Sequence, residues 1–160
     1  MSEEKKESKD KAMLYALRVL GMRMHSEAEL RKKFRIKNFS RSEIETAIEK
    51  LKNSKLINDL KFTEVYLEEL RAKGLGDIQV KQKLKLRGLK DDLIDSVFEP
   101  EPYELQLEKA LDLAQTKIDI DKPINAKDKN RIYSFLARKG FDFEICRSVV
   151  DNLKSEQELL

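Results

Sequence analysis

Hydrophobic residues recur in one ten-position frame at three places along the chain. The frame is apolar at its first, fifth and tenth positions and carries a turn-forming residue at its ninth. Its copies are Leu30, Phe34, Asn38 and Phe39, then Val80, Leu84, Gly88 and Leu89, then Ile132, Leu136, Gly140 and Phe141. The copies begin at residues 30, 80 and 132, and a period of about 50 residues indicates a repeated supersecondary unit rather than a heptad. We therefore predict a stacked repeat architecture.

The elements of each repeat are predicted to be helices. Apolar residues four positions apart share one helix face, and Asn or Gly at the ninth position can end a helix in the left-handed conformation. Two capping boxes, Ser26 with Glu29 and Ser40 with Glu43, mark helix starts. A third helix in each repeat has an inward face that starts at Ile44, Ile94 or Cys146. We predict an all-α fold of three tandem three-helix repeats packed into an elongated, curved array.

The repeats are expected at residues 10–57, 58–99 and 103–154, after a flexible tail of alternating Lys and Glu at residues 1–9. Pro100 and Pro102 exclude a helix interior between the second and third repeats and stiffen that junction. A unit of about 45 residues buries little surface by itself, so neighbouring repeats are expected to pack end to end.

Composition supports a helical protein and narrows its class. Of 160 residues 39% are charged, with 5 Gly, 3 Pro and no Trp, so the backbone has few helix breakers. No apolar stretch approaches the roughly 20 residues that a membrane span needs, and the first residues lack the apolar core of a signal peptide. Cys146 is the only cysteine, so no intrachain disulfide is expected. We expect a cytoplasmic monomer that does not associate with membranes.

Residues suited to catalysis or metal binding are scarce. His25, the only histidine, precedes a helix cap and is expected on a surface loop, whereas Cys146 takes a core position. A structural zinc site usually needs four Cys or His ligands, and no Ser or Cys is placed to use a His base. Gly74-Leu75-Gly76 lacks the Lys and Ser/Thr of a phosphate-binding loop. We therefore predict no enzymatic activity, no cofactor and no metal.

Basic residues concentrate on the second helix of each repeat. The net charge is only +3, so this local excess matters more than the total. Repeated basic helices can form a positive stripe that suits phosphate oxygens or an acidic protein groove. Lys and Arg also solvate ordinary helix faces and complement helix C-termini, and this interpretation stays open. The candidate partner-binding or nucleic-acid-binding residues are Arg31, Lys32, Lys33, Arg35, Lys81, Lys83, Lys85, Arg87, Arg138 and Lys139.

The third repeat weakens this basic pattern. Tyr133, Phe135 and Ala137 lie between the basic residues of its second helix. Core packing is the commoner fate of aromatic residues at this spacing, and anchoring of a partner is the alternative. Both interpretations stay open for Tyr133 and Phe135.

A series of short motifs runs through the chain in a fixed order. The series consists of Ala16-Leu17-Arg18-Val19-Leu20 with Arg23, Ser26, Glu29, Leu30 and Phe34, then Leu56 to Phe62, Lys73 to Gly76, Ile78, Lys81, Leu84 and Gly88-Leu89, and finally Leu136 to Phe141. In this order the motifs resemble the RecX family of regulatory proteins, modulators of the RecA recombinase, over about residues 12 to 152. The structural motif residues that the resemblance assigns are Leu30, Phe34, Asp59, Phe62, Gly74, Gly76, Leu84, Gly88, Gly140 and Phe141.

Two residues depart from the pattern of that family. Thr63 stands where Ala is usual, and Asp77 stands where Pro is frequent after the glycine. Both are expected at helix starts, where Thr and Asp are good caps, so neither changes the interpretation.

The resemblance implies tandem three-helix repeats that lie in the helical groove of a RecA filament on single-stranded DNA. There the protein hinders strand exchange, ATP hydrolysis and filament growth, and it can bind DNA itself. A non-catalytic regulator of the RecA filament is the leading hypothesis. A direct DNA-binding module of helix-turn-helix type is the alternative, because a three-helix unit with a basic helix can resemble one. A scaffold for another protein is a third hypothesis.

Overall fold

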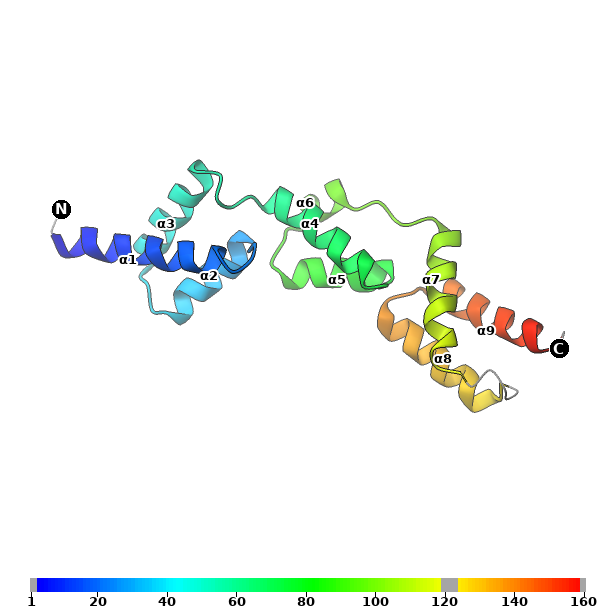
Figure 1. Ribbon diagram of the computed structural model, residues 1–160. Helices are drawn as coiled ribbons and strands as arrows, with labels where there is room; N and C mark the ends of the chain where they lie inside the picture. Colours follow the sequence, from blue (N-terminus) through cyan, green and yellow to red (C-terminus); the bar gives the residue numbers. More distant parts are fainter. Residues whose placement is uncertain (1–2, 119–123, 159–160) are drawn as a thin grey trace. The chain divides into compact units, whose positions relative to one another are not determined.

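The structure, a computed structural model, describes residues 3–118 and 124–158, with side chains for residues 10–118 and 124–153. Within these residues the chain forms α-helices joined by short loops, without a strand (Figure 1). The helices are α1 (Glu3–Leu20), α2 (Glu27–Ile36), α3 (Arg41–Asn53), α4 (Asp59–Ala72), α5 (Asp77–Leu86), α6 (Asp91–Val97), α7 (Tyr103–Gln115), α8 (Ala126–Lys139) and α9 (Phe143–Glu158). The prediction of an all-α repeat array is confirmed.

The helix boundaries follow the sequence signals that predicted them. Ser26 and Glu29 form a complete capping box at the start of α2, and Ser40 and Glu43 form another at the start of α3. The ninth frame residues Asn38, Gly88 and Gly140 have φ angles of 60°, 76° and 92°, which is the left-handed conformation expected after a helix. No helix lies between Val97 and Tyr103, where the two prolines stand.

The first helix starts earlier than expected. The flexible tail was predicted at residues 1–9, but α1 begins at Glu3, and residues 1 and 2 lie outside the described residues. Lys and Glu are strong helix formers, so a segment of mixed charge that precedes an amphipathic helix can extend that helix.

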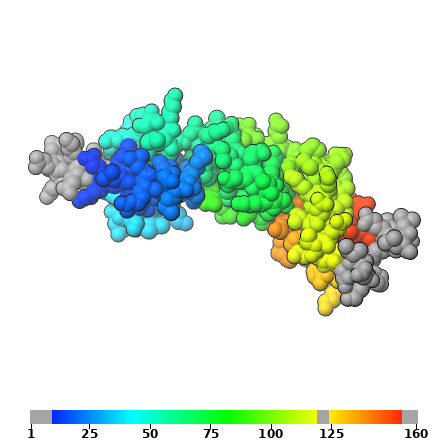
Figure 2. Space-filling view, viewed as in Figure 1, coloured from blue at the N-terminus to red at the C-terminus, as the bar shows by residue number. Residues whose placement is uncertain are grey.

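The chain divides into two compact units. Unit 1 consists of Met1–Tyr66 and Leu84–Val97, and unit 2 consists of Leu67–Lys83 and Phe98–Leu160, so the division passes through α4 and α5. In unit 1, α3 packs on α1 and α2, as the adjoining blue and cyan segments show (Figure 2). The core of this unit contains Ala12, Ala16, Val19, Leu30, Phe34, Ile44, Ala47, Ile48, Leu51 and Ile57. Phe39 is half-buried beside it, with its ring centroid 5.5 Å from that of Phe34.

In unit 2, α9 packs on α7 and α8 (Figure 1). The core contains Ala110, Ala114, Ile132, Leu136, Phe141, Ile145, Cys146, Val149 and Leu153. Cys146 is fully buried as predicted, and burial raises the pKa of its thiol to about 11. Tyr133 and Phe135 are half-buried against this core, which favours the packing interpretation for both.

Candidate functional site

The ten-position frame sorts the residues of the second helices by exposure. At its third, sixth and seventh positions the side chains are exposed in all three copies. We call these the ridge positions. They are Lys32, Arg35 and Ile36 on α2, Gln82, Lys85 and Leu86 on α5, and Ser134, Ala137 and Arg138 on α8. Four of the ten candidate basic residues, Lys32, Arg35, Lys85 and Arg138, therefore occupy ridge positions. Lys85 forms an ion pair with Asp91 at 2.8 Å, with both side chains exposed.

Arg31 stands at the second frame position, where it is half-buried and held by acidic side chains. Its Nε donates to Glu27 at 2.9 Å, and its two Nη atoms donate to the carboxylate of Glu45 at 2.5 and 3.0 Å. Lys52 also pairs with Glu27, at 3.0 Å. Arg31 therefore ties α2 to α3, and a partner would have to displace Glu45 to reach both of its Nη atoms.

Most of the other candidate cations also contact aromatic rings of the protein or are half-buried. Lys81 stands over the ring of Phe98, 4.6 Å from its centroid, and Lys139 lies 5.7 Å from the centroid of Phe135. Such contacts combine a cation–π attraction with burial of the aliphatic stem. Lys33 and Lys83 are half-buried. The candidate basic residues thus fall into two groups. Some are exposed to solvent, and others contact aromatic rings or carboxylates of the protein itself.

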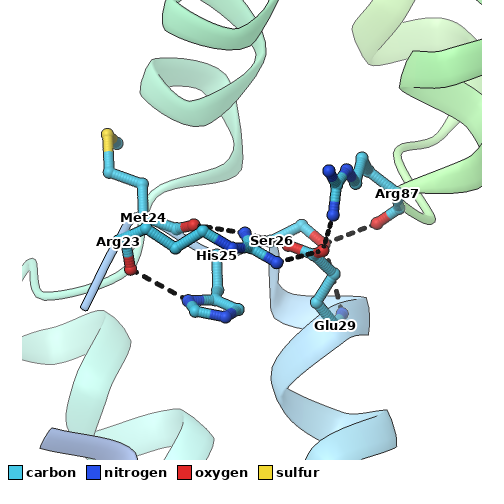
Figure 3. Close-up of polar contacts among 6 residues, drawn as sticks. All are labelled: Arg23, Met24, His25, Ser26, Glu29 and Arg87. Carbon is cyan, nitrogen blue, oxygen red and sulfur yellow. Dashed lines mark hydrogen bonds and ion pairs between the residues drawn. The ribbon is translucent and has the colours of Figure 1, made fainter. Parts of the chain in front are cut away.

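Arg87 belongs to a joint between α5 and α2 inside unit 1 (Figure 3). Ser26 Oγ donates to the carbonyl oxygen of Arg87 at 2.5 Å and accepts from Glu29 N at 3.1 Å. The guanidinium of Arg87 donates to the Glu29 carboxylate at 2.5 Å and lies 4.8 Å from the ring centroid of Tyr66. A carbonyl just past the end of α5 thus meets the first turn of α2, where helix N–H groups and the positive end of the dipole lie. We call this arrangement the first joint.

Glu29 lies at the centre of the first joint. Its carboxylate also accepts from Arg23 and from Ser26 N (Figure 3), at 3.2 and 3.0 Å for Arg23 and at 3.2 Å for Ser26. The Glu29 side chain is only 14% exposed. Burial acts to raise the pKa of Glu29, but the hydrogen bonds from Arg23, Arg87 and Ser26 outweigh burial and lower this pKa to about 2. The sequence identified Glu29 as a capping residue only, and its role in linking two repeats has no local signal.

A second joint of the same design lies inside unit 2, between α8 and α5. Gly76 N donates to the carbonyl oxygen of Lys139 at 3.0 Å. Counted from the first frame residue of their repeats, Gly76 and Lys139 occupy the positions that Ser26 and Arg87 occupy in the first joint. In each unit, therefore, the end of one second helix docks on the start of the second helix of the preceding repeat.

The joints explain why the ninth frame residue is Gly in the second and third copies and Asn in the first. A Cβ atom on Gly88 would lie closer than 3.0 Å to Ala28, and one on Gly140 would lie closer than 3.0 Å to the backbone of Gln79. Both glycines also adopt a positive φ, which side chains disfavour. Asn38 has the same backbone conformation but takes part in neither joint, so its side chain is accommodated.

Of the two departures from the family pattern, Asp77 lies at a helix start as expected and Thr63 does not, and the expectation that they cap their own helices is wrong. Asp77 is the first residue of α5, and its carboxylate accepts from Glu101 N at 3.0 Å and from Gln106 Nε2 at 3.3 Å. Burial raises the pKa of Asp77, and a proline would supply no such acceptor. Thr63 is fully buried one turn inside α4, where its hydroxyl donates to the Asp59 carbonyl at 2.6 Å.

The other motif residues serve the fold. Leu30, Phe34, Phe62, Leu84 and Phe141 are buried, and Gly74 has a φ of 68°. The Asp59 carboxylate accepts from Glu27 N at 2.8 Å and so ties the start of α4 to the start of α2. Burial raises the pKa of Asp59. These contacts hold the helices in place, and none of them involves a side chain at a ridge position.

His25 lies in the loop before α2, as expected, but it is buried rather than on the surface. Only 4% of the residue is exposed, and its Nδ1 donates to the Arg23 carbonyl at 2.9 Å (Figure 3). The loop faces inward here because the next residue, Ser26, is itself buried in the first joint. Burial lowers the pKa of His25 below its ordinary value of 6.5.

We expect His25 to make the fold less stable as the pH falls from about 7.5 to about 5.5. The unfolded chain protonates this ring near pH 6.5, and the folded chain does so only at lower pH, so the unfolded state binds more protons in this range. His25→Gln should remove this part of the loss. Thermal unfolding of both proteins at the two pH values measures it, and an equal loss in the two proteins would contradict the assignment.

The part of the chain that the structure describes offers neither a metal-binding cluster nor a membrane-spanning helix. Among these residues no group of three or more His, Cys, Asp or Glu side chains is placed to hold a metal ion. None of the described helices combines the length and the apolar character that a membrane crossing requires.

The first and third repeats match known sequence families. A family model described as "RecX, first three-helix domain" matches residues 12–51, and one described as "RecX, third three-helix domain" matches residues 104–150. Together the matches cover more than half of the chain. The chain belongs to the RecX family.

Relatives named regulatory protein RecX are similar to most of this chain. The Bacillus pumilus protein is 34% identical over 150 residues, which is 92% of this chain and 57% of the relative. The Clostridium perfringens protein is 31% identical over 89% of this chain and 68% of its own length. The Haemophilus influenzae protein is 31% identical over 91% of this chain and 96% of its own length. The chain therefore spans little more than half of one relative and nearly all of another.

Solved structures of RecX proteins share the fold. The crystal structure of RecX from Lactobacillus salivarius matches with a TM-score of 0.76 over 92% of this chain and 97% of that chain, at 24% identity. A second crystal structure, of a regulatory protein RecX, matches with a TM-score of 0.74 over 90% of this chain, at 22% identity. At these identities the likeness concerns the fold alone.

Proposed function

We propose that this chain is a non-catalytic cytoplasmic regulator that binds the filament of the RecA recombinase on single-stranded DNA. Bound there as a monomer, it lowers ATP hydrolysis, strand exchange and filament growth. The observation that carries the proposal is membership of the RecX family, whose members compared above are named regulatory proteins.

The repeated frame supplies a physical reason for a filament as the partner. In unit 1, α2 and α5 both expose their sixth and seventh frame positions, and the exposed cations of these two helices in that unit include Lys32, Arg35 and Lys85. A filament presents identical sites at regular spacing, so several weak contacts on one chain add through effective concentration. Cations on an exposed helix face favour an acidic partner surface and speed the encounter with it.

Titration of DNA-dependent ATP hydrolysis tests the proposal. The purified chain in saturating excess is expected to suppress hydrolysis by the RecA protein of the same organism. An unchanged rate at saturation would contradict the proposed function, whatever the behaviour of any variant.

Charge reversal at the ridge positions should weaken this suppression. Lys32→Glu, Arg35→Glu and Lys85→Glu together are expected to raise the half-maximal concentration by about 10-fold or more at low salt, because each reversal replaces attraction with repulsion. Arg87 is unsuitable for this test, since its reversal would break the pair with Glu29.

The matched control reverses three exposed cations of unit 1 outside the ridge positions, namely Lys50, Lys55 and Lys90. It changes the net charge by the same amount and should shift the half-maximal concentration by less than about 3-fold. Equal losses in both triple variants would assign the effect to net charge and remove the ridge positions from the mechanism.

Direct DNA binding is the second candidate function, and the recurrence of cations on the second helices favours it. The affinity of the chain for single-stranded and duplex DNA, measured without RecA at several salt concentrations, separates this function from the proposed regulator. Tight binding with a steep salt dependence would support the nucleic-acid module. Weak binding that becomes tight only with RecA present would support the regulator.

A further inference from the structure

Two large apolar side chains stand among the cations of the ridge positions. Ile36 on α2 is 67% exposed and Leu86 on α5 is 83% exposed. Both occupy the seventh frame position, and both belong to unit 1. Single exposed apolar residues are ordinary on protein surfaces. A large exposed apolar side chain at the same frame position of two equivalent helices, however, indicates a functional role.

The surroundings of these side chains are basic. Arg35 and Lys32 adjoin Ile36 on α2, and Lys85, which pairs with Asp91, precedes Leu86 on α5. A hollow of about 380 Å³ opens beside Arg35, and it is lined by Arg31, Arg35, Phe39, Arg41, Ile44 and Glu45. Arg31 is bound to Glu45, the one acid among these residues, so the remaining positive charge comes from Arg35 and Arg41. The hollow therefore suits an acidic side chain of a partner.

An apolar side chain ringed by polar and charged groups is the usual anatomy of a protein-binding hot spot. Burial of an aliphatic side chain at such a contact contributes more binding free energy than an exposed charge pair does. Nucleic acid suits these positions less well, because single strands are bound by aromatic stacking and phosphates by cations. Neither Ile nor Leu provides either interaction.

We infer that Ile36 and Leu86 are the apolar anchors of the contact with the recombinase protein. Each anchor enters a pocket on the recombinase, and acidic residues around that pocket pair with the cations that adjoin the anchor. This inference rests on the proposed function and deepens it, since it commits to protein rather than DNA as the surface bound at these positions. Arg138 stands at the seventh position in the third copy, so two of the three copies carry an anchor.

The double variant Ile36→Ala with Leu86→Ala tests the inference. It is expected to raise the half-maximal concentration for suppression of RecA ATP hydrolysis by about 10-fold or more, and to weaken direct binding to RecA filaments equally. Binding of the variant to DNA alone should stay within about 2-fold of the unaltered chain. Because both side chains are exposed, the melting temperature should not change.

The matched control is the double variant Leu14→Ala with Met22→Ala. These residues are 67% and 83% exposed, the same fractions as Ile36 and Leu86, but they lie outside the second helices. The control should suppress hydrolysis like the unaltered chain. A 10-fold loss in the control as well would overturn the assignment of the anchors, since it would reflect general surface hydrophobicity.

The other outcomes are also decisive. If Ile36→Ala with Leu86→Ala suppresses hydrolysis as well as the unaltered chain does, the anchor assignment is wrong and the proposed function stands. If the variant loses DNA binding by the same factor as filament binding, the commitment to protein is overturned. If the unaltered chain fails to suppress hydrolysis, the proposed function fails and the inference fails with it.

Discussion

Gly140→Ala is expected to lower the free energy of unfolding by about 2–4 kcal/mol. The left-handed conformation of Gly140 costs a side chain about 1 kcal/mol. The added Cβ would also lie closer than 3.0 Å to backbone atoms of Gln79, and overpacking of this kind costs about 1–3 kcal/mol. The backbone of α5 cannot yield as a flexible side chain would, so the second joint has to open. Denaturant unfolding followed by circular dichroism measures the change.

Two further substitutions separate the causes. Asn38→Ala retains the left-handed strain without a joint and is expected to cost about 1 kcal/mol. Gly21→Ala introduces neither left-handed strain nor a close contact, because its backbone is not left-handed and the nearest atom to its new Cβ is 3.4 Å away. This substitution should change the free energy of unfolding by less than about 1 kcal/mol. If Gly140→Ala cost no more than Asn38→Ala, close packing in the second joint would be refuted.

Glu29→Gln is expected to cost about 2 kcal/mol at neutral pH. The fall of the Glu29 pKa from 4.5 to about 2 corresponds to roughly 3 kcal/mol at about 1.36 kcal/mol per unit, and partial solvent access reduces this value. Gln preserves the shape of the side chain but withdraws the charge from both Arg23 and Arg87. Urea titration of the variant and the unaltered chain gives the difference directly.

The pH dependence of this difference identifies its origin. Because the folded pKa of Glu29 is depressed, its stabilisation is fully present above pH 4.5 and is lost as the pH falls towards about 2. The stabilities of variant and unaltered chain should therefore converge in acid. Glu43→Gln alters the equivalent capping box of α3 on the exposed surface and should cost less than about 1 kcal/mol. A difference for Glu29→Gln that stays constant down to about pH 2.5 would rule out the charge as its cause.

The local part of this fold could be predicted from the sequence. The apolar spacing of Leu30 and Phe34, the capping boxes and the left-handed residues depend on neighbours within a few positions, so a single repeat contains their signals. Recurrence of the frame near residues 80 and 132 then indicated an array. The start of α1 was missed because charged helix formers such as those after Glu3 carry no apolar periodicity to mark them.

The contacts of the site could not be predicted in the same way. Ser26 and Arg87 are separated by 61 residues, and nothing close to either one indicates the other. The same holds for Asp77 and Glu101, which are 24 residues apart. One signal was present in the sequence. The change from Asn38 to Gly88 at an equivalent position indicates that a Cβ became intolerable there, and hence that another part of the chain comes close.

Sorting of the basic residues also required the structure. Arg31 and Arg35 lie one helical turn apart and have the same chemistry, yet Arg31 is held by Glu45 from another helix. Charge patterns along one helix carry no information about acids that approach from elsewhere. A stripe of basic residues read from sequence therefore overestimates the number of cations open to a partner.

The division through α4 and α5 has a consequence for any attempt to shorten this protein. A fragment that ends with the first repeat, near residue 57, would lack Leu84–Val97 and would leave the buried hydroxyl of Ser26 without its carbonyl acceptor. A fragment that begins with the third repeat would likewise lack Gly76 and its bond to Lys139. The middle repeat is shared by both compact units, so deletion of one repeat damages its neighbour. The sequence consists of repeats, but each compact unit needs residues from the middle repeat, so the repeats do not fold as separate modules.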